Sequence, residues 1–312
     1  MQKQISVIIP CLNERENIKA CLDSIYLAEL PSDLSMQVIL VDNGSVDGTL
    51  SIVRSFPVEI IQDRTKTISG LRNLGAAHAR GDNLAFVDAD CIVSKTWIKE
   101  AARYFDQTEV ILWGAPPVIP ENATWVQNTW YLVRQKKEEI GETEWLESMN
   151  LFVRKDFFHC IGGFNETLKT AEDVDFCYRA AKKGKIVTDC RIRVVHCGEA
   201  ADIRSFIKKE IWRGSTNFSG IKSHGITAKE LPSLIIPILY GIVLPATLVF
   251  AAWAQSFTSL ILAVLFYFAP VFAVVSRAAI KRPGIGLKTL IKLFFLIQVY
   301  FFSRAVSLAK IS

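Results

Sequence analysis

The 312-residue sequence predicts an α/β domain with a mostly parallel sheet flanked by helices, followed by a C-terminal α-helical transmembrane region. Two observations predict this class. The first 90 residues alternate short apolar runs with segments of helical periodicity, and this order produces a parallel sheet with right-handed crossovers. From residue 231 onward, long apolar runs carry no Asp or Glu.

The apolar patterns of the first 90 residues place the individual elements. Residues 5–10 (ISVIIP) form a continuous apolar run, which is typical of a strand covered on both faces. Residues 13–28 have helical periodicity. The alternation then predicts further strands at 36–44, 57–63 and 83–90, and helices at 49–56 and 69–81, the last closed by Gly81.

The pattern changes after residue 109. Five segments follow, with no internal repeat between them. They are predicted as a strand at 110–119, an aromatic-rich helix at 124–140, a strand, short helix and glycine turn at 148–164, a helix at 170–184, and one or two strands at 185–198.

Residues 226–312 form the expected membrane region. Segments at about 231–253 and 257–275 are each long enough to cross a hydrocarbon core of about 30 Å as a helix. A third apolar segment, at about 287–308, is interrupted by Lys288, Lys292 and Arg304. It either spans the bilayer with snorkelling ends or lies in the interface, and we favour the interface. The alternative for the whole tail is the buried helical core of a soluble protein.

Charge is divided unevenly along the chain. The tail from residue 231 holds seven of the 36 basic residues and none of the 31 acidic ones. Residues 1–230 therefore have a net charge of −2 and the tail has a net charge of +7, which together give the +5 of the chain. Because these basic residues are scattered between apolar runs, we expect no nucleic-acid partner. Four of them lie within 276–288, and the positive-inside rule places that loop in the cytoplasm. We therefore expect a multi-pass protein of the cell membrane whose first 225 residues also face the cytoplasm.

Seven cysteines lie in the first 200 residues without C-x-x-C spacing. This odd number without paired spacing is typical of reduced thiols in a cytosolic domain, and it argues against disulfides and zinc.

Three predicted strands end in acids or amides, with the sequences PCLNERE, VDNGSVDGT and DAD. Because the carboxyl ends of parallel strands meet at one sheet edge, we expect a polar ligand site there. In an extended strand Asp88 and Asp90 point the same way, and a divalent cation relieves the repulsion between two such carboxylates. Their oxygens suit Mg²⁺ or Mn²⁺. The alternative is a plain strand end followed by an Asp turn.

Five motifs now stand in order over roughly residues 4–200. They are SVIIPCLNERENI, ILVDNGSVDGT, GLRNLGAAHARGDNLAFVDADC, GGFNETL followed by AEDVDFCYR, and VVHCG. In this order the chain resembles the family 2 glycosyltransferases, which use nucleotide sugars and have the GT-A fold. The resemblance implies a cytosolic, Rossmann-like GT-A domain over residues 1–225.

The resemblance implies a donor nucleotide site at the ends of the first strands. It places Pro10, Asn13 and Glu14 in a loop against the nucleotide. Asp42 matches the acid that accepts from the imino N–H of a pyrimidine, as an acceptor-only carboxylate can. Arg72 matches an arginine near the diphosphate, and a solvated helix face is the alternative for this residue.

The resemblance also implies a metal site. Asp88 and Asp90 match the DXD motif, with Asp90 as the direct ligand of Mg²⁺ or Mn²⁺ and Asp88 as the ribose or metal partner. The cation improves the nucleoside diphosphate as a leaving group. His196 matches a histidine that completes the metal shell in some relatives, and a structural histidine is the alternative.

The acidic motif AEDVD implies the acceptor chemistry. Asp173 matches the catalytic base, Glu172 is expected to position the acceptor or the base, and a single base implies inversion at the anomeric carbon. Processive relatives carry Gln-x-x-Arg-Trp beyond residue 200, whereas this chain has EIWRGSTNF, which favours transfer of a single sugar. There, Trp212 and Arg213 are expected to bind the acceptor or a lipid diphosphate, with a basic surface helix as the alternative.

The expected function is metal-dependent, inverting transfer of one hexose or related sugar from a nucleotide-diphosphate sugar to a lipid-linked or cell-surface glycan acceptor. The reaction would take place at the cytosolic face of the membrane. One alternative is a polyprenyl-phosphate sugar synthase, in which the acceptor is a phosphate and Asp173 contributes little as a base. Another is a non-catalytic, membrane-anchored scaffold that binds nucleotide sugars.

Overall fold

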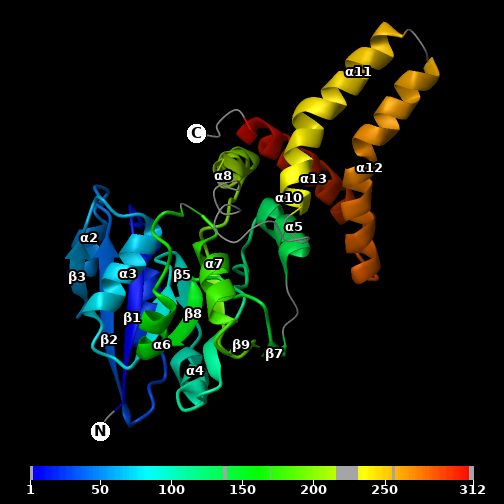
Figure 1. Cartoon of the computed structure of the whole chain (residues 1–312). Coiled ribbons are helices and arrows are strands. Elements are labelled where there is room, and N and C mark those ends of the chain that lie inside the picture. The colour runs from blue at the N-terminus through cyan, green and yellow to red at the C-terminus, as the bar shows by residue number, and fades with distance from the viewer. Residues whose placement is uncertain (1–2, 136–138, 169, 216–230, 255–256, 309–312) are drawn as a thin grey trace. The chain divides into compact units, whose positions relative to one another are not determined.

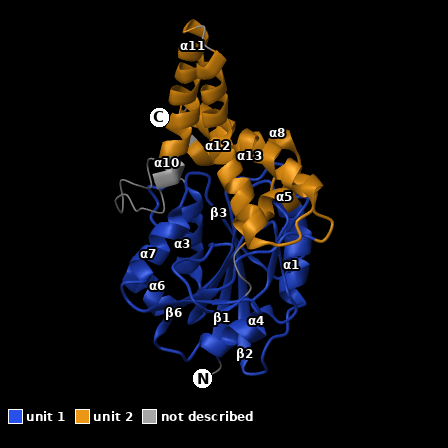
Figure 2. Ribbon diagram, turned by 90° about the vertical axis from the view of Figure 1, so that its right-hand side faces the viewer, with its two compact units in different colours: residues 1–120, 136–198 blue, residues 121–135, 199–312 orange. Residues whose placement is uncertain are grey.

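The computed structural model describes residues 3–135, 139–168, 170–215, 231–254 and 257–308 (Figure 1). The chain forms two compact units, residues 1–120 with 136–198 and residues 121–135 with 199–312 (Figure 2). The boundary expected at residue 225 lies outside the described residues. Helix α5 (Trp125–Arg134) interrupts the first unit in sequence but belongs to the second.

A mostly parallel sheet of eight strands forms the centre of the first unit, as the alternating pattern predicted. The described strands are β1 (Lys3–Cys11), β2 (Leu34–Asp42), β3 (Glu59–Gln62), β4 (Asn83–Val87), β5 (Cys91–Val93), β6 (Val110–Gly114), β7 (Ile140–Glu142), β8 (Asn150–Arg154), β9 (Lys185–Asp189) and β10 (Val194–His196). Their order in the sheet is β3-β2-β1-β4-β8-β6-β9-β7. Strand β8 runs antiparallel between β4 and β6, and β7 runs antiparallel to β9. Strands β5 and β10 form a separate antiparallel pair.

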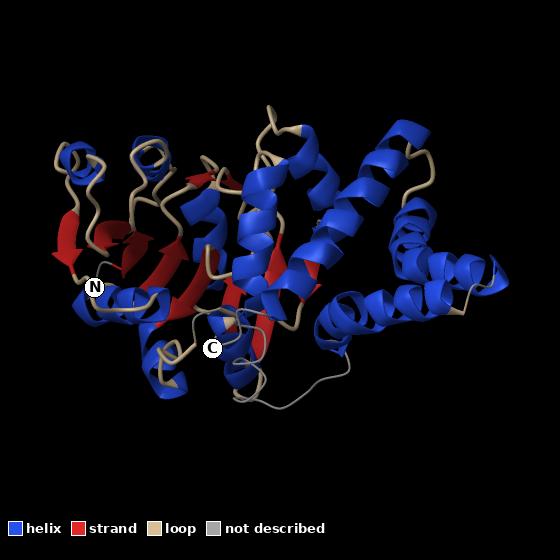
Figure 3. Cartoon of the chain, turned by 90° about the horizontal axis from the view of Figure 1, so that it is seen from above, coloured by secondary structure: helices blue, strands red, loops and turns tan. Residues whose placement is uncertain are grey.

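Helices cover both faces of this sheet (Figure 3). They are α1 (Ile18–Tyr26), α2 (Thr49–Val53), α3 (Ile68–His78), α4 (Trp97–Ala101) with a 3₁₀ turn at Ala102–Tyr104, α6 (Lys155–Ile161) and α7 (Glu172–Ala180). Successive residues of β1 point to opposite faces. Val7 and Ile9 pack in the core that contains α1 and α4, whereas Ile8 packs in the core that contains α3, α6 and α7. The central strands of the sheet are therefore buried on both sides, whereas the edge strands β3 and β7 are partly exposed.

Two local predictions were wrong. Strand β4 ends at Val87, so Asp88 and Asp90 lie in a turn and not in an extended strand. The Cys91 N–H closes this turn on the Asp88 carbonyl at 3.0 Å. Helix α3 ends at His78, so Gly81 does not cap it. Gly81 instead lies against β1, where a methyl group would be 2.7 Å from the Ser6 nitrogen.

The second unit is helical over its described residues. Besides α5 it contains α8 (Ile203–Ser215), α10 (Leu231–Ile238), α11 (Leu244–Trp253), α12 (Phe257–Lys281) and α13 (Leu287–Ser307), with a π turn at Leu239–Val243. Three helical stretches, Ile235–Trp253, Phe257–Lys281 and Leu287–Ser307, are long and apolar enough to cross a membrane. Helices α11 and α12 run side by side, as expected for a helical hairpin (Figure 1).

Asn150 connects three parts of the first unit beside the end of β4. Its side chain is fully buried, and its Oδ1 accepts from Trp97 Nε1 at 2.9 Å. Its Nδ2 donates to the carbonyls of Ala115 and Ile192 at 2.9 and 2.7 Å. Because Asn150 pairs with Val87, these bonds hold the strand end from which the DAD turn leaves.

We expect Asn150→Leu to destabilise the protein, because it leaves one N–H and two carbonyls buried without partners at about 1–3 kcal/mol each. The apparent melting temperature of the detergent-solubilised full chain should fall by roughly 5–10 °C. Asn122→Leu, at an exposed position, serves as the control. Equal melting temperatures for the two variants would contradict the role assigned to Asn150.

Candidate active site at the strand ends

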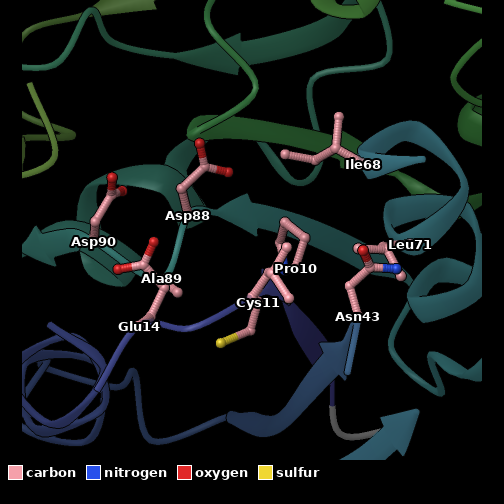
Figure 4. Close-up of a pocket in the computed structure, with 10 residues that line it drawn as sticks. Pro10, Cys11, Glu14, Asn43, Ile68, Leu71, Asp88, Ala89 and Asp90 are labelled. Carbon is pink, nitrogen blue, oxygen red and sulfur yellow. The ribbon is translucent and has the colours of Figure 1, made fainter. Parts of the chain in front are cut away.

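A pocket of about 260 Å³ opens at the carboxyl ends of β1, β2 and β4 (Figure 4). Its lining includes four of the residues predicted for the site, Pro10, Glu14, Asp88 and Asp90. Burial raises the pKa of Glu14, a hydrogen bond from Asn17 partly offsets this, and the charges of Asp90 and Asp88 raise it further. The pocket therefore concentrates negative charge, which favours a cationic ligand.

Arg72 joins the DAD turn to the acidic start of α7. Its guanidinium is 1% exposed, and it donates from Nη2 to Asp88 Oδ1 at 2.7 Å and from Nη1 to Glu172 Oε1 at 2.8 Å. Burial lowers the pKa of Arg72, but Asp88 and Glu172 more than reverse this effect and raise it. Arg72 is thus a buried cation between two motifs, and the alternative of a solvated helix face was wrong.

His196 and Gly198 fix the position of Asp90. The β5–β10 pairing aligns His196 with Cys91, and His196 Nε2 lies 3.1 Å from Asp90 Oδ2. A methyl group at Gly198 would be 1.7 Å from the same oxygen, so only glycine leaves room for this carboxylate. Sequence reasoning missed Gly198, although its place two residues after His196 in VVHCG was a usable signal.

The residues of the DAD turn fit a divalent cation. The side chains of Asp88 and Asp90 are 22% and 18% exposed, and their carboxylates lie with that of Glu14 around the pocket (Figure 4). Among the described residues, no group of three His, Cys, Asp or Glu side chains forms a complete ligand set. Mg²⁺, however, is usually held by one or two carboxylates together with phosphate oxygens and water, and Asp88 and Asp90 can provide these carboxylates.

Asp173 lies in the first turn of α7, two residues after the N-cap Ala171, whose φ of 60° is unusual for a residue with a side chain. The Val174 N–H donates to Asp173 Oδ1 at 2.8 Å. Burial raises the pKa of Asp173 to about 7, with further contributions from the charges of Glu172 and Glu147. No sequence motif had singled out Glu147. Such a carboxyl group can accept a proton near neutral pH.

Two residues that were predicted to bind the nucleotide, Asn13 and Asp42, form hydrogen bonds within the loops and do not line the pocket. Asn13 donates from its backbone to Ser45 Oγ at 2.8 Å and accepts from the Val46 N–H at 2.9 Å. Asp42 is fully buried and accepts from the N–H groups of Gly44 and Ser45 at 3.0 and 3.1 Å. Both side chains thereby order the turn that follows β2.

The predicted acceptor residues Trp212 and Arg213 lie on α8 in the second unit. Trp212 is 55% exposed. Arg213 donates to Glu210 Oε1 at 2.7 Å and lies 3.4 Å from Glu199 Oε1. Trp212 is therefore largely exposed to solvent, whereas its neighbour in sequence, Arg213, belongs to a cluster of ion pairs.

Comparisons with known proteins agree with this geometry. Residues 6–164 match the family described as Glycosyl transferase family 2. Glycosyltransferase AglE of Haloferax volcanii is 30% identical over 246 residues, which cover 76% of this chain and 80% of AglE.

The fold is similar to that of two solved structures. Mannosyltransferase PcManGT from Pyrobaculum calidifontis, in complex with GDP-Man and Mn²⁺, has a TM-score of 0.61 at 20% identity over 97% of this chain and 86% of that one. S. aureus TarS 1-349 in complex with UDP-GlcNAc has a TM-score of 0.52 at 17% identity over 97% of this chain and 90% of that one. With its GT-A architecture and its matching motifs, the chain belongs to glycosyl transferase family 2 and is a glycosyltransferase.

Proposed function

We propose that this glycosyltransferase is metal-dependent and inverting, and that it moves a single hexose or related sugar from a nucleotide-diphosphate sugar to a lipid-linked or cell-surface glycan acceptor. The observation that carries the proposal is the buried Arg72, which holds Asp88 of the DAD turn and Glu172 of the acidic motif on one guanidinium. This shared cation supports the proposal that the DAD turn, as the metal motif, and the acidic motif, as the base motif, act on one substrate pair.

The DAD turn would hold the donor diphosphate through Mg²⁺ or Mn²⁺. PcManGT was solved with Mn²⁺ and a nucleotide sugar, which supports this assignment. Asp90 would be the direct ligand, with His196 at 3.1 Å to orient or supplement it, and Asp88 would bind metal or ribose. The cation, when bound, would offset the negative charge that develops on the departing diphosphate.

Asp173 would act as the base at the acceptor. It would take the proton of an acceptor hydroxyl while that oxygen attacks the anomeric carbon from the face opposite the diphosphate. One C–O bond forms and the C–O bond to the diphosphate breaks, so the configuration inverts. Glu172, held by Arg72, would keep the start of α7 and thus Asp173 in place.

The helical unit would attach the enzyme to the cell membrane, with the catalytic unit facing the cytoplasm. The four basic residues at 276–288, where α12 ends and α13 begins, support this orientation through the positive-inside rule. Helix α13 packs against α5 and α8 and carries Lys288, Lys292 and Arg304, which supports an interfacial position. A membrane location brings the site to the plane where lipid-linked acceptors lie.

We expect nucleoside diphosphate release from one member of a panel of UDP-, dTDP- and GDP-sugars, measured with membranes that contain the full chain. Release should require Mn²⁺ or Mg²⁺ and stop with EDTA. Asp90→Asn should lower it by about 10²–10³-fold, because it removes a charged metal ligand. Asp82→Asn, at an exposed position beside β4, should leave it unchanged.

Full activity in EDTA would refute the metal assignment. If no donor is turned over even with lipid extract as the acceptor source, the scaffold alternative replaces the enzyme proposal.

A pH profile tests Asp173. Because its pKa is raised to about 7, the protonated and inactive form dominates below that pH, so kcat/KM should rise as pH increases through about 7. Asp173→Asn should remove this limb and lower kcat/KM by about 10²–10⁴-fold. Asp156→Asn, exposed on α6, is the control. An Asp173→Asn variant with nearly full activity would instead support a phosphate acceptor, as in a polyprenyl-phosphate sugar synthase.

A further inference from the structure

The segment 143–149 connects β7 with β8 and is held at both of its ends. At its start, the Thr143 N–H donates to the Ile186 carbonyl of β9 at 2.9 Å. At its end, the Asn150 N–H donates to the Glu147 carbonyl at 3.1 Å. The side chain of Asn150 is fixed by three buried hydrogen bonds, so the backbone of Glu147 is attached to a rigid part of the first unit.

Leu146 holds this segment against α7. Its N–H donates to Cys177 Sγ at 3.4 Å, and the same thiol donates to the Leu146 carbonyl at 3.6 Å. Both residues are fully buried in the core that contains α7. Asp173 lies four residues before Cys177, so the two side chains project from one face of the helix. Glu147 directly follows Leu146 and is 8% exposed, and its charge acts on Asp173.

Charged groups from three parts of the first unit surround Asp173. Burial is the largest cause of its raised pKa, followed by the charges of Glu172 on α7 and of Glu147. Arg72 of α3 lowers this pKa and has a smaller effect than either acid. Its guanidinium donates to Glu172 and Asp88, so a change at Glu172 would also break an ion pair of Arg72. At Glu147 the charge beside Asp173 can be changed while both ion pairs of Arg72 stay in place.

We propose that Glu147 is a positioning residue of the acceptor side, which acts through Asp173 and prepares that carboxylate to take the proton of the acceptor hydroxyl near neutral pH. The inference rests on the proposed role of Asp173 as the base. A like charge beside a carboxylate favours its protonated form, so Glu147 makes Asp173 the stronger proton acceptor. A base is most effective when its pKa lies near the working pH. This role requires no contact between Glu147 and either substrate.

The pH profile of kcat/KM tests this role, measured on membranes that contain the full chain. Glu147→Gln keeps the size of the side chain and removes its charge. The rising limb of the profile should move to lower pH by about one pH unit, because the charge that favours protonated Asp173 is gone. At about pH 6 the variant should therefore show about five times more of its own plateau activity than the wild type does. Glu139→Gln, at an exposed position before β7, should leave the limb in place.

Two further variants separate charge from packing. Glu147→Asp and Glu147→Asn are both shorter by one methylene group and differ only in charge, so the limb of the Asn variant should lie at lower pH. This pair gives the same comparison if Glu147→Gln does not accumulate in the membrane. A role in packing alone would lower activity at every pH and would leave the limb at its wild-type position.

The outcomes distinguish this inference from the proposed function. A limb that Asp173→Asn removes, but that stays at the wild-type pH in Glu147→Gln and does not differ between the Asp and Asn variants, would overturn the role of Glu147 and leave the base assignment intact. A limb that persists in Asp173→Asn would overturn the base assignment, and the role of Glu147 with it.

Discussion

A buried guanidinium is the interaction on which the site depends. Arg72 on α3 pairs with Asp88 at the end of β4 and with Glu172 at the start of α7. Removing the cation from such a group leaves buried carboxylates without compensation, at a cost of about 3–5 kcal/mol. The positions of the DAD turn and of the start of α7 are therefore tied to one side chain, and so is part of the stability of the first unit.

Around this cation, each remaining acid has its own environment. Asp90 is held by His196 and has space only because residue 198 is glycine. Asp173 lies beside two other acids in a partly buried turn, which raises its pKa to about 7. Carboxyl groups of one chemical type thus acquire different properties through burial and neighbours. In the proposed mechanism, this difference lets Asp90 hold a cation while Asp173 exchanges a proton.

The ion pairs of the helical unit are arranged differently from those around Arg72. In the first unit one arginine lies between two acids, whereas in the second unit Glu199 lies within 3.5 Å of three cations and Glu210 lies within 3.0 Å of two. The first arrangement supports the proposed site for a metal and a diphosphate donor.

The sequence alone determined the order of strands and helices, the apolar tail and the family, because these depend on local periodicity and on motifs within short segments. It also indicated Asp88, Asp90 and Asp173 as candidates. Only the tertiary structure decided that residues 88–90 form a turn, and that Arg72 is buried against a glutamate 100 positions away. Contacts at such separations depend on how the sheet and its helices pack, and local sequence patterns contain no information about that packing.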